Sequence, residues 1–316
     1  MWIIPHIAIL SPAAAWQRVR QWFLPRFCQS LEPADAAEVV ALLAARLGID
    51  ALVASGEWGT IQSAPLDKAV FAVYARTGTW APTTNRLFIE FFKARGGGMY
   101  LDIGANIGLT TIPVARNPEV ACVAFEPDPI NFRNLTANVA ANCPHGNVTL
   151  RPLAVYAHRC TLAFELSDRN LGDHRIRPDH TSGSGQGRRE TRVEAAPLDE
   201  LIGGIPGPLA VKCDTQGAEP FVVSGGSRVL SRADLVVLEF WPYGMAMLGA
   251  DPETVFSFIA PFPRVRILSK EHKGNELPPP IDRPIDALRA FMRQHRANSR
   301  MYVDLVAERN VSQGGS

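Results

Sequence analysis

The stretch "YLDIGANIG", residues 100–108, places a short apolar strand directly before a turn that holds two glycines and an asparagine. In a doubly wound parallel sheet, the carboxyl end of the first strand opens a crevice in which ligands bind. Gly104 and Gly108 have no side chain, so backbone N–H groups of this turn can come close to a ligand. The stretch therefore predicts the first strand and the ligand-binding turn of an α/β sheet.

The sequence that follows this turn alternates short apolar runs with amphipathic helical stretches. This alternation is typical of a parallel sheet with crossover helices. We expect a mostly parallel, seven-stranded sheet with helices on both faces, in a domain that covers residues 96–310. Pro113 falls inside the expected first crossover helix and predicts a kink there. The expected strands are residues 99–103, 120–126, 148–154, 208–213, 234–240, 263–268 and 301–307.

The flanking regions have different patterns. Residues 1–95 are expected to form a mainly helical N-terminal extension, because apolar residues in the stretch 32–50 recur at helical spacing. Residues 167–191 are polar, glycine-rich and basic, which predicts a mobile loop or lid. Residues 311–316 are expected to be a flexible tail.

The composition excludes some classes of partner. The chain has 316 residues, 47% of them hydrophobic and 20% charged, and a net charge of +1, which is typical of a globular protein without a nucleic-acid footprint. Its apolar opening stretch is too short and too interrupted by proline to span a bilayer. The five cysteines form no C-x-x-C pair and are expected to be reduced. We therefore expect a cytoplasmic protein without stable membrane insertion, and association into homo-oligomers stays open.

The turn after residue 103 also indicates a class of ligand. Asp102 at the end of the strand can accept a hydrogen bond from a charged amino group, whereas a pyrophosphate would prefer helix N–H donors. The turn reads G-A-N-I-G and lacks the middle glycine of G-x-G-x-x-G. Glu126, at the end of the second strand, can accept from both hydroxyls of a ribose. Together these residues favour a nucleoside that bears an amino acid over NAD, although Asp102 and Asn106 could merely cap the next helix.

A second polar cluster follows the strand 208–213, in the stretch "KCDTQGAE". Lys212 and Asp214 are two residues apart in a strand, so their side chains lie on the same side. Asp214 could act as a base or could simply pair with Lys212, and both interpretations stay open. Asp214 and Glu239 end neighbouring strands, but without a third ligand we expect no metal site.

Five motifs in order resemble the FkbM family of S-adenosylmethionine-dependent methyltransferases. They are D-I-G-A-N-I-G, E-P-D-P with a following helix rich in Asn and Leu, P-L-D-E-L (197–201), K-C-D-T-Q-G-A-E and V-L-E-F. The resemblance covers residues 97–270 and implies a Rossmann-like class I methyltransferase fold.

The resemblance also implies roles for individual residues. Glu126 would hold the ribose, and Asp214 would lie beside the methyl group as the first candidate for a general base. Lys212 beside it and His174 on the loop are the other catalytic candidates. The residues expected to bind the cofactor are Asp102, Gly104, Asn106, Gly108, Glu126, Pro127 and Ala154.

The expected function is methyl transfer from S-adenosylmethionine to a hydroxyl of a small molecule, a sugar or glycan, or a polyketide-type product. Trp241 and Tyr243 could form walls of the acceptor pocket or belong to the core. Two alternatives remain at this point: a nicotinamide-dependent oxidoreductase on a similar fold, and a non-catalytic scaffold that binds the cofactor.

Overall fold

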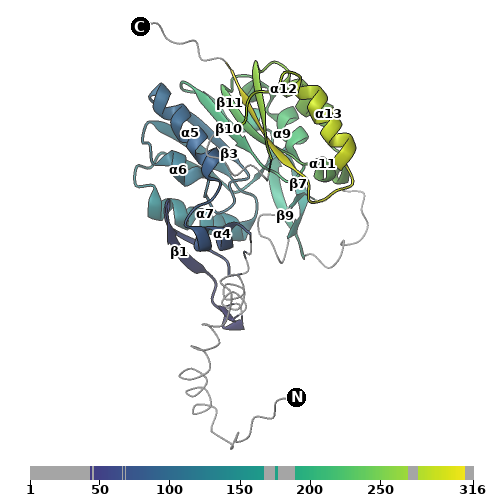
Figure 1. Ribbon diagram of the computed structural model, residues 1–316. Helices are drawn as coiled ribbons and strands as arrows, with labels where there is room; N and C mark the ends of the chain where they lie inside the picture. The colour runs from purple at the N-terminus through teal and green to yellow at the C-terminus, as the bar shows by residue number, and fades with distance from the viewer. Residues whose placement is uncertain are drawn as a thin grey trace, which may run out of the picture. The chain divides into compact units, whose positions relative to one another are not determined.

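The computed structural model describes residues 43–309 except residues 45, 66, 68, 167–174, 177–188 and 270–276. By its internal contacts the chain divides into Met1–Asp50 and Ala51–Ser316. The sequence predicted this division after residue 95. The difference arises because helices between residues 51 and 95 pack into the core of the sheet. All features below belong to the second unit (Figure 1).

The centre of this unit is a seven-stranded sheet in the order β12-β13-β11-β10-β3-β4-β5. The five strands β11, β10, β3, β4 and β5 run parallel to one another, whereas β13 runs antiparallel to both β11 and β12. This arrangement confirms the predicted mostly parallel, seven-stranded sheet. The strands are β3 (Gly98–Ile103), β4 (Val120–Phe125), β5 (Val148–Arg151), β10 (Leu209–Cys213), β11 (Leu235–Phe240), β12 (Arg264–Ser269) and β13 (Val303–Glu308).

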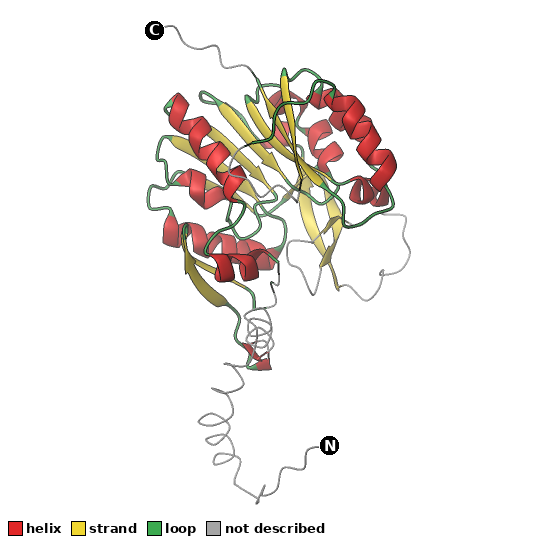
Figure 2. Cartoon of the chain, in the orientation of Figure 1, coloured by secondary structure: helices red, strands yellow, loops and turns green. Residues whose placement is uncertain are grey.

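Helices cover both faces of the sheet, as Figure 2 shows. Alternate residues of each strand point to opposite faces, so the apolar strands supply two separate cores. Met99, Leu101 and Ile103 face one core, while Tyr100 faces the other. The first core contains α9 (Glu219–Gly225), α12 (Pro252–Ile259) and α13 (Pro284–His295); the second contains α4 (Val70–Thr77), α5 (Pro82–Arg95), α6 (Thr111–Ala115) and α7 (Pro129–Asn142).

The first crossover helix, α6, is only five residues long. Pro113 is its third residue, where the backbone N–H would have no partner inside the helix anyway. The predicted kink is therefore wrong, because the helix is too short to be bent by this proline. This short helix lies in the connection between the neighbouring parallel strands β3 and β4.

The expectation of a mainly helical N-terminal extension is wrong for residues 52–63. They form an antiparallel hairpin of β1 (Leu52–Gly56) and β2 (Gly59–Ser63). Its edge strand β2 contacts the side of α7 through three asparagines that are four residues apart, Asn134, Asn138 and Asn142. The Asn138 amide accepts from Gln62 N at 2.8 Å and donates to Gln62 O at 2.9 Å.

Asn142 repeats this pairing with the backbone of Thr60, one strand repeat further on. The side-chain amides of α7 thus occupy the hydrogen-bonding positions that a neighbouring strand would fill. Asn134, Asn138 and Asn142 are consequently a docking surface for the hairpin, and none of the three lines the cavity described below.

A second, smaller sheet has the order β6-β9-β7-β8. Its strands are β6 (Ala154–Val155), β7 (Cys160–Leu166), β8 (Arg175–Ile176) and β9 (Arg189–Ala196). Parts of the predicted loop 167–191, namely residues 175–176 and 189–191, are therefore strand residues. The rest of that predicted loop lies outside the described residues, as does the predicted tail.

The remaining short helices are α8 (Leu198–Leu201), α10 (Ser227–Leu230) and α11 (Pro242–Leu248). In the ranges that the structure describes, no helix has both the length and the apolar character to span a membrane.

Candidate functional site

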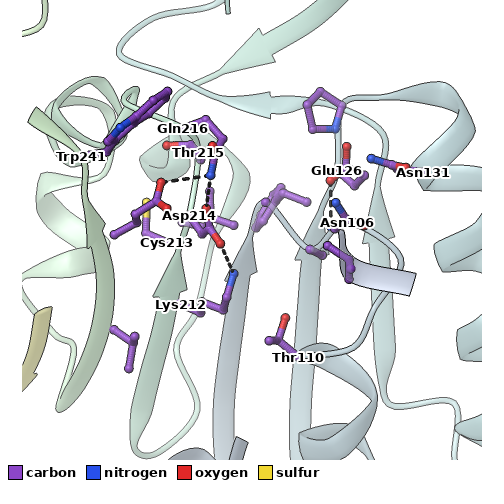
Figure 3. Close-up of a pocket in the computed structure, with 18 of the residues that line it drawn as sticks. Asn106, Thr110, Glu126, Asn131, Lys212, Cys213, Asp214, Thr215, Gln216 and Trp241 are labelled. Atoms are coloured by element: carbon purple, nitrogen blue, oxygen red, sulfur yellow. Dashed lines mark hydrogen bonds and ion pairs between the residues drawn. The ribbon is translucent and has the colours of Figure 1, made fainter. Parts of the chain in front are cut away.

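A cavity of about 710 Å³ lies at the carboxyl ends of the central parallel strands. Its volume falls within the range of about 300–1,000 Å³ typical of cofactor and substrate sites. Figure 3 shows Glu126, Asn106 and Asn131 at one end of the cavity and Asp214, Gln216 and Trp241 at the other. One continuous cavity therefore joins the glycine turn to the second polar cluster that the sequence singled out.

The glycine turn lies against the backbone that follows β10. Gly104 has a φ of +84°, and a Cβ atom at this position would lie 1.9 Å from the Asp214 carbonyl oxygen. Only glycine fits such a contact. Asn106 also has a positive φ of +53°, and its N–H donates to Glu126 Oε2 at 2.8 Å. Gly108 does not line the cavity; it makes room for the Leu135 side chain of α7.

Asp102 is fully buried beneath the cavity and does not line it. One carboxylate oxygen accepts hydrogen bonds from the hydroxyls of Thr110 at 2.7 Å and Thr111 at 2.6 Å. The other oxygen lies 3.9 Å from Lys212 Nζ. The sequence could not reveal these hydroxyls above the carboxylate, which make Asp102 a support of the turn in this structure.

Glu126 is at the carboxyl end of β4, and only 5% of its surface is exposed. Its Oε2 accepts from Asn106 N, and its Oε1 accepts from Asp128 N at 2.9 Å. Burial, together with the nearby Asp128 carboxylate, raises the pKa of Glu126 to about 8. The predicted residues Pro127 and Ala154 also line the cavity.

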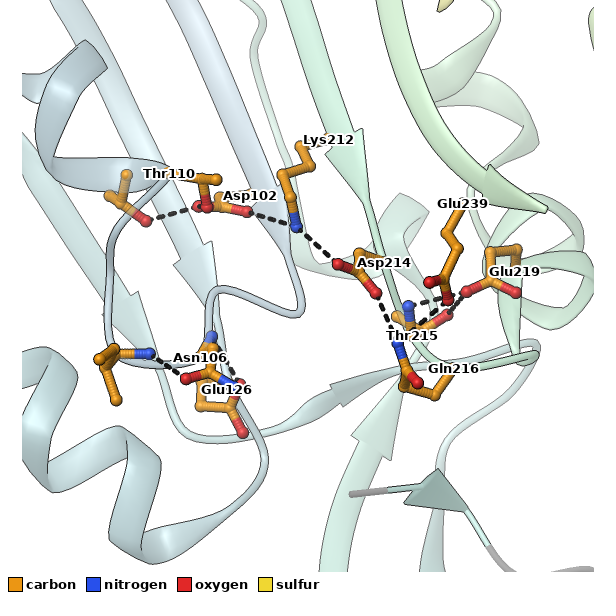
Figure 4. A network of polar contacts seen from close by, with 12 residues as sticks. Asp102, Asn106, Thr110, Glu126, Lys212, Asp214, Thr215, Gln216, Glu219 and Glu239 are labelled. Carbon is orange, nitrogen blue, oxygen red and sulfur yellow. Dashed lines mark hydrogen bonds and ion pairs between the residues drawn. The ribbon is translucent and has the colours of Figure 1, made fainter. Parts of the chain in front are cut away.

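The opposite end of the cavity is built around Asp214, which follows β10. Lys212 Nζ lies 3.3 Å from Asp214 Oδ2, which confirms that the two side chains are on the same side of the strand. Burial alone would lower the pKa of Lys212, but the charges of Asp214 and Asp102 outweigh it and raise that pKa. Lys212, whose side chain is 12% exposed, thus links the two carboxylates as a largely buried cation (Figure 4).

The turn after Asp214 is held by Glu219, the last residue of the K-C-D-T-Q-G-A-E motif (212–219). Its Oε1 accepts from Thr215 N at 2.8 Å, from the Thr215 hydroxyl at 3.0 Å and from Gly217 N at 3.3 Å. Gly217 packs against Gly244, where any side chain would overlap the backbone. The second carboxylate of the motif therefore fixes the turn, and it does not line the cavity.

Several residues of this end were not singled out from the sequence as site residues. Asp304 of β13 is the cross-strand neighbour of Glu239, so both carboxyl groups lie on the same face of the sheet. Burial and the charge of Asp214 raise the pKa of Asp304 to about 6, and they raise that of Glu239 well above its usual range. The alternation in "MYVDLV", residues 301–306, is the signal that could have placed Asp304 inward.

Aromatic rings complete this end. Trp241 and Tyr243 both line the cavity, with ring centroids 5.6 Å apart. Trp241 Nε1 donates to Ser299 O at 3.2 Å, so the indole is anchored through its polar atom. Of the two interpretations left open by the sequence, the structure supports the pocket wall.

The segment between α4 and α5 also borders the cavity through Trp80 and Ala81, and the first turn of α5 does so through Thr84. Asn85 anchors it by donating to Trp80 O at 2.8 Å and Leu109 O at 3.1 Å. Part of the stretch 1–95 thus packs against the segment after the glycine turn and lines the cavity. His174 lies outside the described residues, so its role stays a prediction.

Within the parts of the chain that the structure describes, no group of three or more His, Cys, Asp or Glu residues has an arrangement that could hold a metal ion. Among the same residues, three that are not glycine have a positive φ, namely Ala81, Asn106 and Gln216. All three line this cavity. Strained backbone is concentrated where the cavity is built, as expected for a functional site.

Comparison with known proteins agrees with this geometry. A family model described as "Methyltransferase FkbM domain" matches residues 102–267, more than half of the chain. The chain is 27% identical over 181 residues to the hexuronic acid methyltransferase AglP of Haloferax volcanii, an alignment that covers 55% of this chain and 66% of that relative. It therefore spans slightly less than two thirds of the relative's length.

Solved structures give weaker similarity. A precorrin-6y C5,15-methyltransferase from Geobacter metallireducens has a TM-score of 0.36 and 12% identity, covering 71% of this chain and 88% of that one. TYW2 of M. jannaschii, solved in complex with AdoMet, has a TM-score of 0.36 and 11% identity, covering 83% and 87%. TM-scores this low support no functional comparison.

Proposed function

Because the chain belongs to the FkbM methyltransferase family, we propose that it transfers a methyl group from S-adenosylmethionine to a hydroxyl of a small-molecule or glycan acceptor. One observation carries this proposal: a single cavity joins Glu126 at the end of β4 to Asp214 at the end of β10. A cofactor held by Glu126 and an acceptor placed beside Asp214 would therefore occupy one continuous cavity.

The cavity fits an adenosyl cofactor in two respects. At Gly104, where the turn and the strand end nearly touch, the cofactor would meet no side chain. Each oxygen of Glu126 accepts one backbone N–H bond, and a carboxylate oxygen has two lone pairs. When Glu126 is ionised, one lone pair of each oxygen therefore remains for a ribose hydroxyl.

Asp102 acts in this proposal through the turn and through Lys212, since Thr110 and Thr111 cover it. Lys212 lines the cavity and carries the charge that faces the methionine part of the cofactor. Asn106 and Gly104 orient the backbone of the turn around that part.

When bound, S-adenosylmethionine supplies an electrophilic methyl group, and sulfur keeps the electron pair as the carbon–sulfur bond breaks. The acceptor oxygen forms the new bond to carbon, so its hydroxyl proton must leave. Asp214 takes this proton as general base, because its side chain is 39% exposed and faces the cavity. Most of the remaining rate enhancement comes from positioning of the acceptor.

The acceptor end suits a polyhydroxylated molecule. Trp241 and Tyr243 offer an apolar wall, and Glu239 and Asp304 offer oxygens that accept bonds from hydroxyl groups. The relative named as a hexuronic acid methyltransferase acts on a sugar, according to its name. These features support a sugar or glycan hydroxyl as the acceptor.

The test has two steps, both on the purified full chain. Calorimetric titration with S-adenosylhomocysteine should give binding that Glu126→Ala weakens at least tenfold, while Arg159→Ala, on the exposed surface, should bind as wild type does. Transfer of labelled methyl from S-adenosylmethionine should then be measured on a panel of neutral sugars, uronic acids and polyketide alcohols, with Asp214→Asn as the inactive control. If the wild-type protein does not bind S-adenosylhomocysteine, the proposal is overturned.

A further inference from the structure

We propose that Gln216 is a positioning residue that bridges Asp214 to Glu239 and thereby holds the Asp214 carboxylate ready for the acceptor hydroxyl. This inference rests on the proposed methyl transfer. Gln216 is not itself the base; its effect on the reaction passes through Asp214.

The bridge uses both hydrogens of one amide group. Gln216 Nε2 donates to Asp214 Oδ1 at 2.9 Å and to Glu239 Oε2 at 3.0 Å (Figure 4). Both partners are carboxyl oxygens, to which the amide nitrogen can donate. Asp214 receives its other contact from Lys212, on its second oxygen. Its carboxylate is thus held from two sides, by β10 and by the turn after it.

The backbone at Gln216 indicates that this side chain has a function. Its φ is +58°, a conformation that costs a residue with a side chain roughly 1 kcal/mol relative to glycine. The next residue, Gly217, has a φ of +98°. Glycine at 216 would adopt this backbone conformation with less strain. We therefore infer that glutamine is present here for its side-chain amide.

The turn does not need the Gln216 side chain for its shape. Glu219 already binds the N–H groups of Thr215 and Gly217 on both sides of Gln216. The amide therefore serves the two carboxyl groups that it contacts and is not required to close the turn.

A neutral bridge is the chemistry that this place requires. Glu239 is 5% exposed and its pKa is raised, first by burial and then by the charges of Asp214 and Glu219. Without the amide between them, two carboxyl groups that accept from the same nitrogen would repel each other when both are charged. The amide satisfies both groups without adding a charge.

Other titratable groups face the same place. They are Lys212 from β10, Glu219 from α9, Tyr302 just before β13 and Asp304 within it, and each interacts electrostatically with Glu239 or with its neighbour Asp214. A substitution at 216 leaves each of these groups unchanged, so a change in titration after that substitution reports the bridge itself.

The test compares Gln216→Gly with wild type in three measurements. We expect an unchanged or higher midpoint of thermal unfolding, because the strained conformation is relieved, and S-adenosylhomocysteine affinity within twofold. We expect kcat to fall at least tenfold and the acid limb of the pH–rate profile to move to higher pH, because a carboxylate that loses an N–H donor binds its proton more tightly. Gln216→Glu, which keeps the size but adds a charge, should fall further.

A kcat within twofold of wild type would overturn the proposal, as would a fall in kcat matched by a fall in the unfolding midpoint with an unshifted pH profile. A carbon-13 NMR titration of labelled Glu239 supplies a readout that needs no turnover: its midpoint should move up in Gln216→Gly, and an unmoved midpoint would refute the bridge. If wild type transfers no methyl group, the proposed function fails while this titration still decides the role of Gln216.

Discussion

Replacing Gly104 by alanine should push the glycine turn after β3 away from the backbone that follows β10. The new Cβ would lie 1.9 Å from the Asp214 carbonyl oxygen, whereas real Cβ atoms essentially never approach closer than 3.0 Å. The two strand ends must therefore move apart by about 1 Å. They cannot do so freely, because Gly104 N donates to Phe125 O and Asp214 N donates to Ile103 O, each at 3.0 Å.

The expected loss of stability in Gly104→Ala has two parts. The positive φ costs alanine about 1 kcal/mol, and overpacking against held backbone typically adds about 1–3 kcal/mol. Since a shift of about 1 Å in a catalytic group can cost 10²-fold in rate, kcat should fall by about that factor as Asp214 is displaced. Gly146→Ala is the matched control, because Gly146 has a similar φ of +70° with nothing within 4 Å of its Cβ position.

The assay is urea unfolding of both variants together with steady-state methyl-transfer kinetics. Gly146→Ala should lose about 1 kcal/mol of stability and keep its kcat, whereas Gly104→Ala should lose clearly more stability and most of its kcat. Equal stability losses in the two variants, with kcat of Gly104→Ala within threefold of wild type, would refute the claim that the close contact positions Asp214.

Three further predictions concern the hairpin, the buried carboxyl groups and the buried cation. Asn138→Ala removes three hydrogen bonds between α7, the hairpin and the glycine turn, so urea unfolding should show a loss of roughly 2–4 kcal/mol, against less than about 0.5 kcal/mol for the exposed Thr136→Ala. The pKa of Glu126 is raised to about 8 in the folded protein, so stability present below its ordinary value of 4.5 is lost as pH rises through 8. Thermal midpoints of the ligand-free protein should fall from pH 5 to pH 8, and fall less in Glu126→Gln; an equal fall would exclude Glu126 as a cause. Lys212→Met leaves the Asp102 carboxylate buried without its cation and should cost about 3 kcal/mol in urea unfolding, part of which Asp102→Asn in the same chain should restore.

Much of the cavity could be located from the sequence because strands end where polar residues begin. Glu126 and Asp214 were placed at the carboxyl ends of β4 and β10, and parallel strands bring those ends to one edge of the sheet. Their roles in binding and catalysis stay predictions. The pattern could not predict how deeply each side chain is buried. Asp102 is also at the end of its strand, yet two threonine hydroxyls cover it.

Contacts between distant parts of the chain were the least predictable. The hairpin 52–63 was expected to be helical because the helical spacing of residues 32–50 was extended to the whole stretch 1–95. Its partner, α7, is more than 70 residues away, so no local pattern marks the contact. Asp304 was missed for a related reason: its strand is antiparallel, so a residue near its beginning faces the end of β11.

The sequence by itself determined the order along the chain of the seven strands of the central sheet, the glycine turn and the family, since periodicity and local motifs are properties of neighbouring residues. Only the tertiary structure decided which carboxyl groups meet. Gln216, Glu239 and Asp304 come from three separate segments, and their hydrogen bonds and raised pKa values arise only when the sheet brings them together and excludes water. Burial and Coulomb interaction depend on distance in space, which the chain acquires only on folding.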